Sequence, residues 1–196
     1  MTNDEALHDG GKMIIRIFVA TLTSLLCCPF ANAGDLSEIS NYREYSPTFS
    51  SSGQPTKEQL QLLKDDGFER IVYIAFSNNG NAFPDEDVVV KELGMDYVHI
   101  PVIWDQPTAS DFYAFAGSMQ REPERKTLLH CQVNYRASAF SFLYRVLYED
   151  VPVADAKADM NSVWQPNETW QTLIFGILEE NGKSPHCDGC SWETDD

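Results

Sequence analysis

The chain has 196 residues, of which 43% are hydrophobic and 12% aromatic, and its formal net charge at pH 7 is −16. This size and composition are sufficient for one hydrophobic core and predict one folded domain. The negative charge repels phosphate backbones and anionic lipid, so nucleic acid and membrane surfaces are not expected as partners.

Residues 1–33 are predicted to form a secretory signal peptide. The segment combines basic Lys12 and Arg16, an apolar run over residues 17–26 and a small-x-small cleavage site at residues 31–33. The apolar run is shorter than the roughly 20 residues that span a bilayer, which argues against a transmembrane anchor.

Met13 is the expected start, because residues 2–11 are acidic and polar where a signal peptide carries basic residues. Cleavage after Ala33 removes 33 of the 196 residues and leaves 163, with a formal charge of −15. A lipid anchor on Cys27 or Cys28 is the alternative, but neither follows the small residues of a lipobox. The sequence therefore predicts an exported protein, periplasmic or secreted, that has no membrane contact after cleavage.

Helices and strands are predicted to alternate along the mature chain, from capping residues, apolar periodicity and glycine stops. In chain order these are a helix over 57–66, a strand over 70–76, a short helix ending near Leu93, a strand over 97–102, a helix over 108–121, a strand over 126–131, and helices over 136–150, 153–164 and 168–182. This order predicts an α/β fold with a mostly parallel central sheet covered by helices. The domain is expected to span residues 34–183, and the acidic tail, residues 184–196, to add little to the core.

Three cysteines remain after cleavage, Cys131, Cys187 and Cys190. In an oxidising compartment, the close spacing of the last two predicts a disulfide, which leaves Cys131 as a free and reactive thiol. His186 beside the tail cysteines invites a zinc interpretation, but three ligands are one short of a structural zinc site. No metal site is therefore predicted.

A polar loop follows the third predicted strand, and Cys131 and Arg136 bracket it. Ligands gather at the carboxyl ends of parallel strands, and the amides of a following helix N-terminus bind anions and favour a thiolate. The planar guanidinium of Arg136 matches an oxyanion, and an arginine at a helix N-terminus otherwise opposes the helix dipole. The alternatives are that Cys131 is a small core residue and that Arg136 is a surface charge. His130 is expected to orient the loop or fill the core.

The sequence His130-Cys131, followed by a loop and Arg136, resembles the signature of cysteine-based phosphatases. In that family the thiolate attacks phosphorus and the arginine binds the phosphoryl oxygens. The family has five residues between cysteine and arginine, whereas this chain has four. With "SGQPTKEQLQLLKDDGFERIVYIAF" and "GMDYVHIPV", the shorter spacing resembles the phosphatase-like N-terminal domain of beta-lactamase-hydrolase-like proteins, a subgroup of the dual-specificity phosphatase fold, over residues 49–147. Rhodanese sulfurtransferases share the same spacing.

The resemblance implies a dual-specificity phosphatase-like fold and roles for several residues. Substrate would be bound by the loop and the helix start, at Gln132, Val133, Asn134, Tyr135 and Ser138. Asn134 replaces a glycine, which is acceptable because asparagine tolerates positive φ. Ala137 replaces a residue whose hydroxyl normally helps the thiolate leave. The general acid would be Asp105, or else Asp111, although either carboxylate could instead face water or cap a helix.

The expected function is hydrolysis of a phosphoester through a cysteinyl-phosphate intermediate, with Cys131 as nucleophile, Arg136 as phosphoryl ligand and Asp105 as acid. No cofactor is expected, and the expected partner is a small anionic or phosphorylated substrate. A rhodanese-like sulfur transfer through a Cys131 persulfide and a non-catalytic oxyanion-binding module are the alternatives. The sequence makes no prediction of oligomeric state.

Overall fold

The computed structural model of the protein describes residues 34–82, 84–188 and 190–193. The predicted signal peptide and the predicted start at Met13 lie outside these residues. Among the described helices, none has the length and apolar character needed to cross a membrane.

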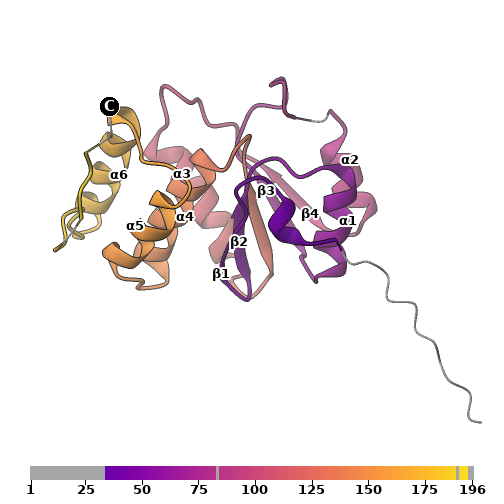
Figure 1. Ribbon diagram of the computed structural model, residues 1–196, viewed down its shortest axis with the longest axis horizontal. Coiled ribbons are helices and arrows are strands. Elements are labelled where there is room, and N and C mark those ends of the chain that lie inside the picture. The colour runs from indigo at the N-terminus through magenta and orange to yellow at the C-terminus, as the bar shows by residue number, and fades with distance from the viewer. Residues whose placement is uncertain (1–33, 83, 189, 194–196) are drawn as a thin grey trace, which may run out of the picture. The chain divides into compact units, whose positions relative to one another are not determined.

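A sheet of five strands forms the centre of the domain (Figure 1). The strands are β1 (Arg43–Ser46), β2 (Phe49–Ser52), β3 (Arg70–Tyr73), β4 (Asp96–His99) and β5 (Thr127–His130). Their order is β1-β2-β5-β3-β4, and every neighbouring pair is parallel except β1 and β2. Strand β5 therefore lies between β2 and β3, and its carboxyl end opens at the middle of the sheet. The predicted mostly parallel α/β fold is confirmed.

Helices cover both faces of the sheet, with α1 and α2 on one side and α3 to α6 on the other (Figure 1). They are α1 (Lys57–Asp65), α2 (Glu86–Glu92), α3 (Ala109–Gln120), α4 (Tyr135–Tyr148), α5 (Val153–Asn161) and α6 (Glu168–Glu180). Two buried clusters result, a small one around Leu60 and Val90 and a larger one around Phe140 and Trp170. Helix α4 is buried along most of its length, as predicted for a core helix.

The predicted helices match the observed ones where the sequence contains capping signals. Thr56 and Gln59 form the predicted capping box of α1, and Thr108, one of two predicted caps, begins α3. The hairpin of β1 and β2 was not predicted. Its buried strand β2 reads Phe-Ser-Ser-Ser and lacks an apolar pattern, and hydroxyl contacts such as that between Tyr45 and Ser51 (2.8 Å) satisfy the buried serines.

The expectation that the tail adds little to the core is wrong at Trp192. Its ring centroid lies 5.0 Å from that of Phe175 and 5.9 Å from that of Phe142. The indole nitrogen donates a hydrogen bond to the carbonyl oxygen of Pro185 at 2.9 Å. One aromatic residue thus anchors a segment whose composition is otherwise polar.

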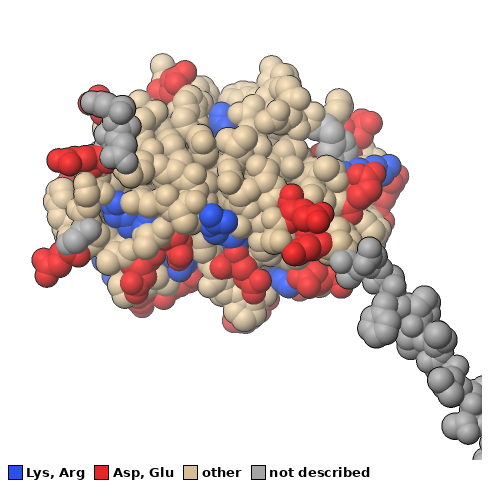
Figure 2. Space-filling view, viewed as in Figure 1, with Lys and Arg blue, Asp and Glu red and all other residues tan. Residues whose placement is uncertain are grey.

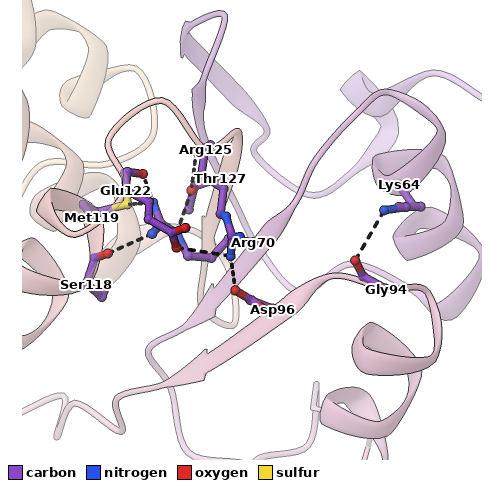
Figure 3. Close-up of polar contacts among 9 residues, drawn as sticks. All are labelled: Lys64, Arg70, Gly94, Asp96, Ser118, Met119, Glu122, Arg125 and Thr127. Atoms are coloured by element: carbon purple, nitrogen blue, oxygen red, sulfur yellow. Dashed lines mark hydrogen bonds and ion pairs between the residues drawn. The ribbon is translucent and has the colours of Figure 1, made fainter.

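The polar contacts of Arg70 are shown in Figure 3. Arg70 lies at the end of the sheet opposite the Cys131 loop. It begins β3 and is buried, and its guanidinium donates to Thr127 Oγ1 at 2.9 Å and to the carbonyl oxygen of Ser118 at 2.8 Å. The carbonyl oxygen of Glu122 accepts a third bond at 3.3 Å. A cation at the C-terminal end of α3 complements the helix dipole, so Arg70 ties that helix to two central strands.

Candidate active site

The loop between β5 and α4 is held in one conformation by two asparagines. Asn134 precedes α4 with φ of 72°, in the left-handed region that was predicted to be tolerable for this residue. Its side-chain amide donates to the carbonyl oxygen of Asn41 at 2.6 Å, and the Asn41 amide donates to that of Val133 at 3.0 Å. This reciprocal pair ties the loop to the segment before β1.

Backbone pairing continues from β2 along the loop. The Gln54 amide donates to the Gln132 carbonyl oxygen at 3.1 Å, and Gly53 forms a bridge with Val133. A Cβ atom at Gly53 would lie 3.0 Å from the Gln132 carbonyl oxygen and 2.9 Å from the Ser40 side chain. Glycine is therefore required here for the close approach of the two chains.

Cys131 comes directly after β5 and is fully buried within the larger core cluster. It is the free cysteine among the described residues. Full burial is what the packing alternative predicts, and the reactivity of the thiol stays a prediction. The burial and the contacts of the neighbouring Arg136 show whether packing alone accounts for the residues of this loop.

Arg136 lies in the first turn of α4 and is only 8% exposed, so it is not a surface charge. Its guanidinium carbon lies 5.2 Å from the centroid of the Trp104 ring. One donor contacts Gln132 Oε1 at 3.4 Å, and the buried Nε has no partner in the described part of the chain. No ion pair among the described residues includes this arginine. A buried guanidinium with unused donors is suited to bind an oxyanion.

This local positive charge stands against a strongly acidic molecule. Figure 2 shows clusters of acidic side chains on one face, with Lys and Arg scattered among them. Because surface charges are screened within about 10 Å in ordinary salt, a buried guanidinium and helix amides can still attract a small anion.

Aromatic side chains wall a pocket of about 320 Å³ over the loop. The pocket is lined by Trp104, Gln132, Val133, Tyr135 and Arg136. The Tyr135 ring stacks on that of Trp164 at 4.9 Å, and Trp164 lies 5.3 Å from Trp104. Neither tryptophan was predicted to be at the site. Trp104 could have been found from its place beside Asp105 at the end of a strand, whereas Trp164 is brought in only by the packing after α5.

Asp105 is exposed on the segment between β4 and α3, directly after Trp104. The structure gives its carboxylate no hydrogen bond within the described residues, and Asp105 is not among the residues that line the pocket. The second choice, Asp111, is engaged in the capping box of α3, where it accepts bonds from the amide and hydroxyl of Thr108. Of the two carboxylates, Asp105 is the one without a hydrogen bond in the described part of the chain.

The hydroxyl of Ser138 takes part in two hydrogen bonds within the fold. It donates to the Tyr135 carbonyl oxygen at 3.1 Å and accepts from the Trp164 indole nitrogen at 3.1 Å. The structure therefore places Ser138 as a support for the aromatic wall, while Ala137, at the position next to Arg136, has no hydroxyl to offer.

The predicted disulfide between Cys187 and Cys190 is present. Within the described ranges, no group of histidine, cysteine and carboxylate side chains is arranged to hold a metal ion.

A cysteine at the end of a central parallel strand and an arginine at the start of the next helix define a cysteine-based phosphatase fold. The chain belongs to the family described as "DSP-PTPase phosphatase fused to NAD+ Kinase", which matches residues 31–172. The predicted resemblance to dual-specificity phosphatases is thereby confirmed. None of the curated proteins matches the sequence.

Solved structures of phosphatases share the fold. A putative phosphatase (DUF442) from Shewanella putrefaciens CN-32 is 33% identical, with a TM-score of 0.68 over 74% of this chain and 96% of that one. TpbA from P. aeruginosa, in complex with pTyr, is 18% identical, with a TM-score of 0.59 over 76% of this chain and 93% of that one. The core catalytic domain of a PP-IP phosphatase from S. cerevisiae, in complex with citrate, is 13% identical, with a TM-score of 0.59 over 74% and 94%.

Proposed function

We propose that this protein hydrolyses small phosphate monoesters through a cysteinyl-phosphate intermediate at Cys131. The observation that carries the proposal is the guanidinium of Arg136, which is buried at the N-terminus of α4 and whose Nε has no partner among the residues that the structure describes. Arg70 is also buried and forms no ion pair within the described ranges, but its guanidinium donates to Thr127 and to backbone carbonyl oxygens. Arg136 leaves a buried charged donor unsatisfied among the described residues, which is costly and which packing alone does not explain. A phosphoryl group in the loop supplies a counter-ion for this guanidinium.

In the first step, the Cys131 thiolate attacks phosphorus, an S–P bond forms and the bond from phosphorus to the leaving oxygen breaks. Arg136 and the loop amides hold the non-bridging oxygens, where negative charge is concentrated in the transition state. Asp105 gives its proton to the leaving oxygen. In the second step, water attacks phosphorus, Asp105 takes a proton from the water, and the S–P bond breaks to return the thiolate and release phosphate.

The pocket supports a substrate with a single phosphoryl group. One buried guanidinium faces a volume of about 320 Å³ that is otherwise lined by Trp104, Tyr135 and uncharged loop residues. The complexes of TpbA with pTyr and of the yeast enzyme with citrate are consistent with small anionic ligands for this fold. A substrate with several phosphates would need more cations than this site holds.

The decisive experiment measures phosphatase activity, phosphate binding and sulfur transfer by the purified protein. The proposal predicts hydrolysis of p-nitrophenyl phosphate by the wild type, no turnover by Cys131→Ser, and similar binding of inorganic phosphate by both, because the amides and Arg136 remain. Sulfur transfer from thiosulfate to a thiol acceptor, without phosphatase activity, would replace the proposal by a Cys131 persulfide mechanism. Phosphate binding with neither activity would leave a binding module.

The proposal includes export to an oxidising compartment, which the disulfide between Cys187 and Cys190 supports. Expression with the full leader should yield a mature protein that begins near Gly34 and is released from the cell envelope. Intact mass of the released form tests this, and a cytoplasmic product that retains residues 13–33 would contradict it.

A further inference from the structure

Glu86 is a buried carboxylate that the proposed reaction does not use. It is the first residue of α2 and only 3% exposed. Its Oε1 atom accepts a hydrogen bond from Gln54 Nε2 at 2.9 Å and lies 3.1 Å from His130 Nε2. Burial of a carboxylate is costly, so the two contacts to one oxygen must offset a large desolvation penalty.

Both partners of Glu86 are joined to the loop on either side of Cys131. His130 immediately precedes the cysteine in the chain. Gln54 donates its backbone amide to the carbonyl oxygen of Gln132, the residue that follows the cysteine. A single carboxylate oxygen on α2 therefore connects to both flanks of the proposed nucleophile.

The His130 ring has little other polar support. It is fully buried, and neither ring nitrogen forms a hydrogen bond within the described residues, so its contact with Glu86 is an approach of Nε2 to the carboxylate at ion-pair distance. One ring face stacks on Tyr73 at 4.7 Å, and Tyr73 stacks in turn on His99 at 5.1 Å, as the register of β5, β3 and β4 dictates. The rings restrict the tilt of His130, and the Glu86 carboxylate lies at ion-pair distance from its Nε2.

We propose, resting on the function proposed above, that Glu86 is a positioning residue that holds the Cys131 loop in its anion-binding conformation through His130 and Gln54. Without the carboxylate, the half-buried Gln54 amide loses its 2.9 Å acceptor and the buried His130 ring loses the charged group beside its Nε2, so both side chains are favoured to move. Movement of either one displaces a neighbour of Cys131.

The test uses the full mature protein and inorganic phosphate as the probe, with binding followed by tryptophan fluorescence. Glu86→Ala should weaken phosphate binding by about tenfold and lower kcat for p-nitrophenyl phosphate by at least as much, because a misplaced loop loses transition-state contacts. Glu86→Gln should restore most of both, since its amide oxygen still accepts from Gln54 and still lies beside His130 Nε2.

Val90→Ala is the matched control, because Val90 is a fully buried residue of the same helix that packs in the smaller core cluster. It should lower the free energy of unfolding and leave phosphate affinity unchanged. If Glu86→Ala does not fold, Gln54→Ala removes one arm of the arrangement and should also weaken phosphate binding. If the folded alanine variants bind phosphate as tightly as the wild type, the role proposed for Glu86 is overturned and the proposed function is not. Failure of the wild type to bind or hydrolyse phosphate compounds would overturn the proposed function, and this inference with it.

Discussion

At the scale of single residues, the loop combines a strained backbone with a buried cation. Asn134 adopts φ of 72° and at the same time donates a hydrogen bond to Asn41. Arg136 lies against Trp104 with donors to spare. In the proposed function, the amides of the helix start and the planar donors of the guanidinium together bind the anion.

Asn134→Ala should lower the free energy of unfolding by about 1–2 kcal/mol, because alanine resists the left-handed conformation and the bond to Asn41 is lost. Asn134→Gly removes the same bond but tolerates the conformation, so its loss should be smaller. Urea unfolding of both variants measures the difference. Equal destabilisation would show that the backbone conformation contributes nothing.

Arg136→Lys keeps the positive charge and removes the planar fork. It should weaken phosphate binding by about tenfold, since a bidentate contact becomes a single one. The matched control is Arg121→Lys, at the exposed end of α3. Tryptophan fluorescence titration reports both affinities, and an unchanged affinity for Arg136→Lys would remove this arginine from the site.

At the scale of elements, sequence predicted best where the signal was local. The helices with capping boxes were placed to within one or two residues, and the spacing of Cys131 and Arg136 identified the loop. Strand β2 was missed because a run of serines is not an apolar pattern, although pairing with β1 and β5 buries it. Glu86 and Trp164 reach the site only through tertiary packing, which no local pattern encodes.

The C-terminal segment gives an element-scale prediction. Trp192 covers Lys157, whose ammonium lies 4.6 Å from the ring centroid, and burial lowers the pKa of that lysine. Trp192→Ala should lower the free energy of unfolding by about 2 kcal/mol through lost apolar burial, while phosphate affinity stays at the wild-type value. Glu193→Ala, at an exposed neighbour, should change neither. Wild-type stability in Trp192→Ala would show that the segment is not anchored.

At the scale of the whole molecule, the buried Tyr73 makes the stability of the fold depend on pH in the alkaline range. Burial raises the pKa of Tyr73 from its ordinary value near 10 to about 12, with the nearby Glu86 carboxylate acting in the same direction. An unfolded tyrosine ionises near pH 10, whereas Tyr73 stays protonated in the folded protein until about pH 12. Unfolding therefore releases a proton in this window, so stability falls as pH rises through it and is unaffected below it.

As the pH rises through this alkaline range, the Tyr73→Phe variant should lose less stability than the wild type. At neutral pH the variant should be less stable than the wild type, because the hydroxyl no longer bonds to Phe76 and Asn79. The difference in the free energy of unfolding between wild type and variant should be smaller at about pH 11 than at about pH 8, because only the wild type has the Tyr73 proton to lose. Urea unfolding at both pH values measures the two differences, and a constant difference would contradict the assignment.

The most direct test of the account is a search for the covalent intermediate on Cys131. The protein is mixed with an aryl phosphate, quenched in acid within its first turnover and digested, and the Cys131 peptide is examined by mass spectrometry. We expect the wild-type peptide to have gained one phosphoryl group on the Cys131 sulfur, and the corresponding peptide of Cys131→Ser to carry none. Hydrolysis that proceeds while the Cys131 peptide never carries phosphate would contradict the central claim.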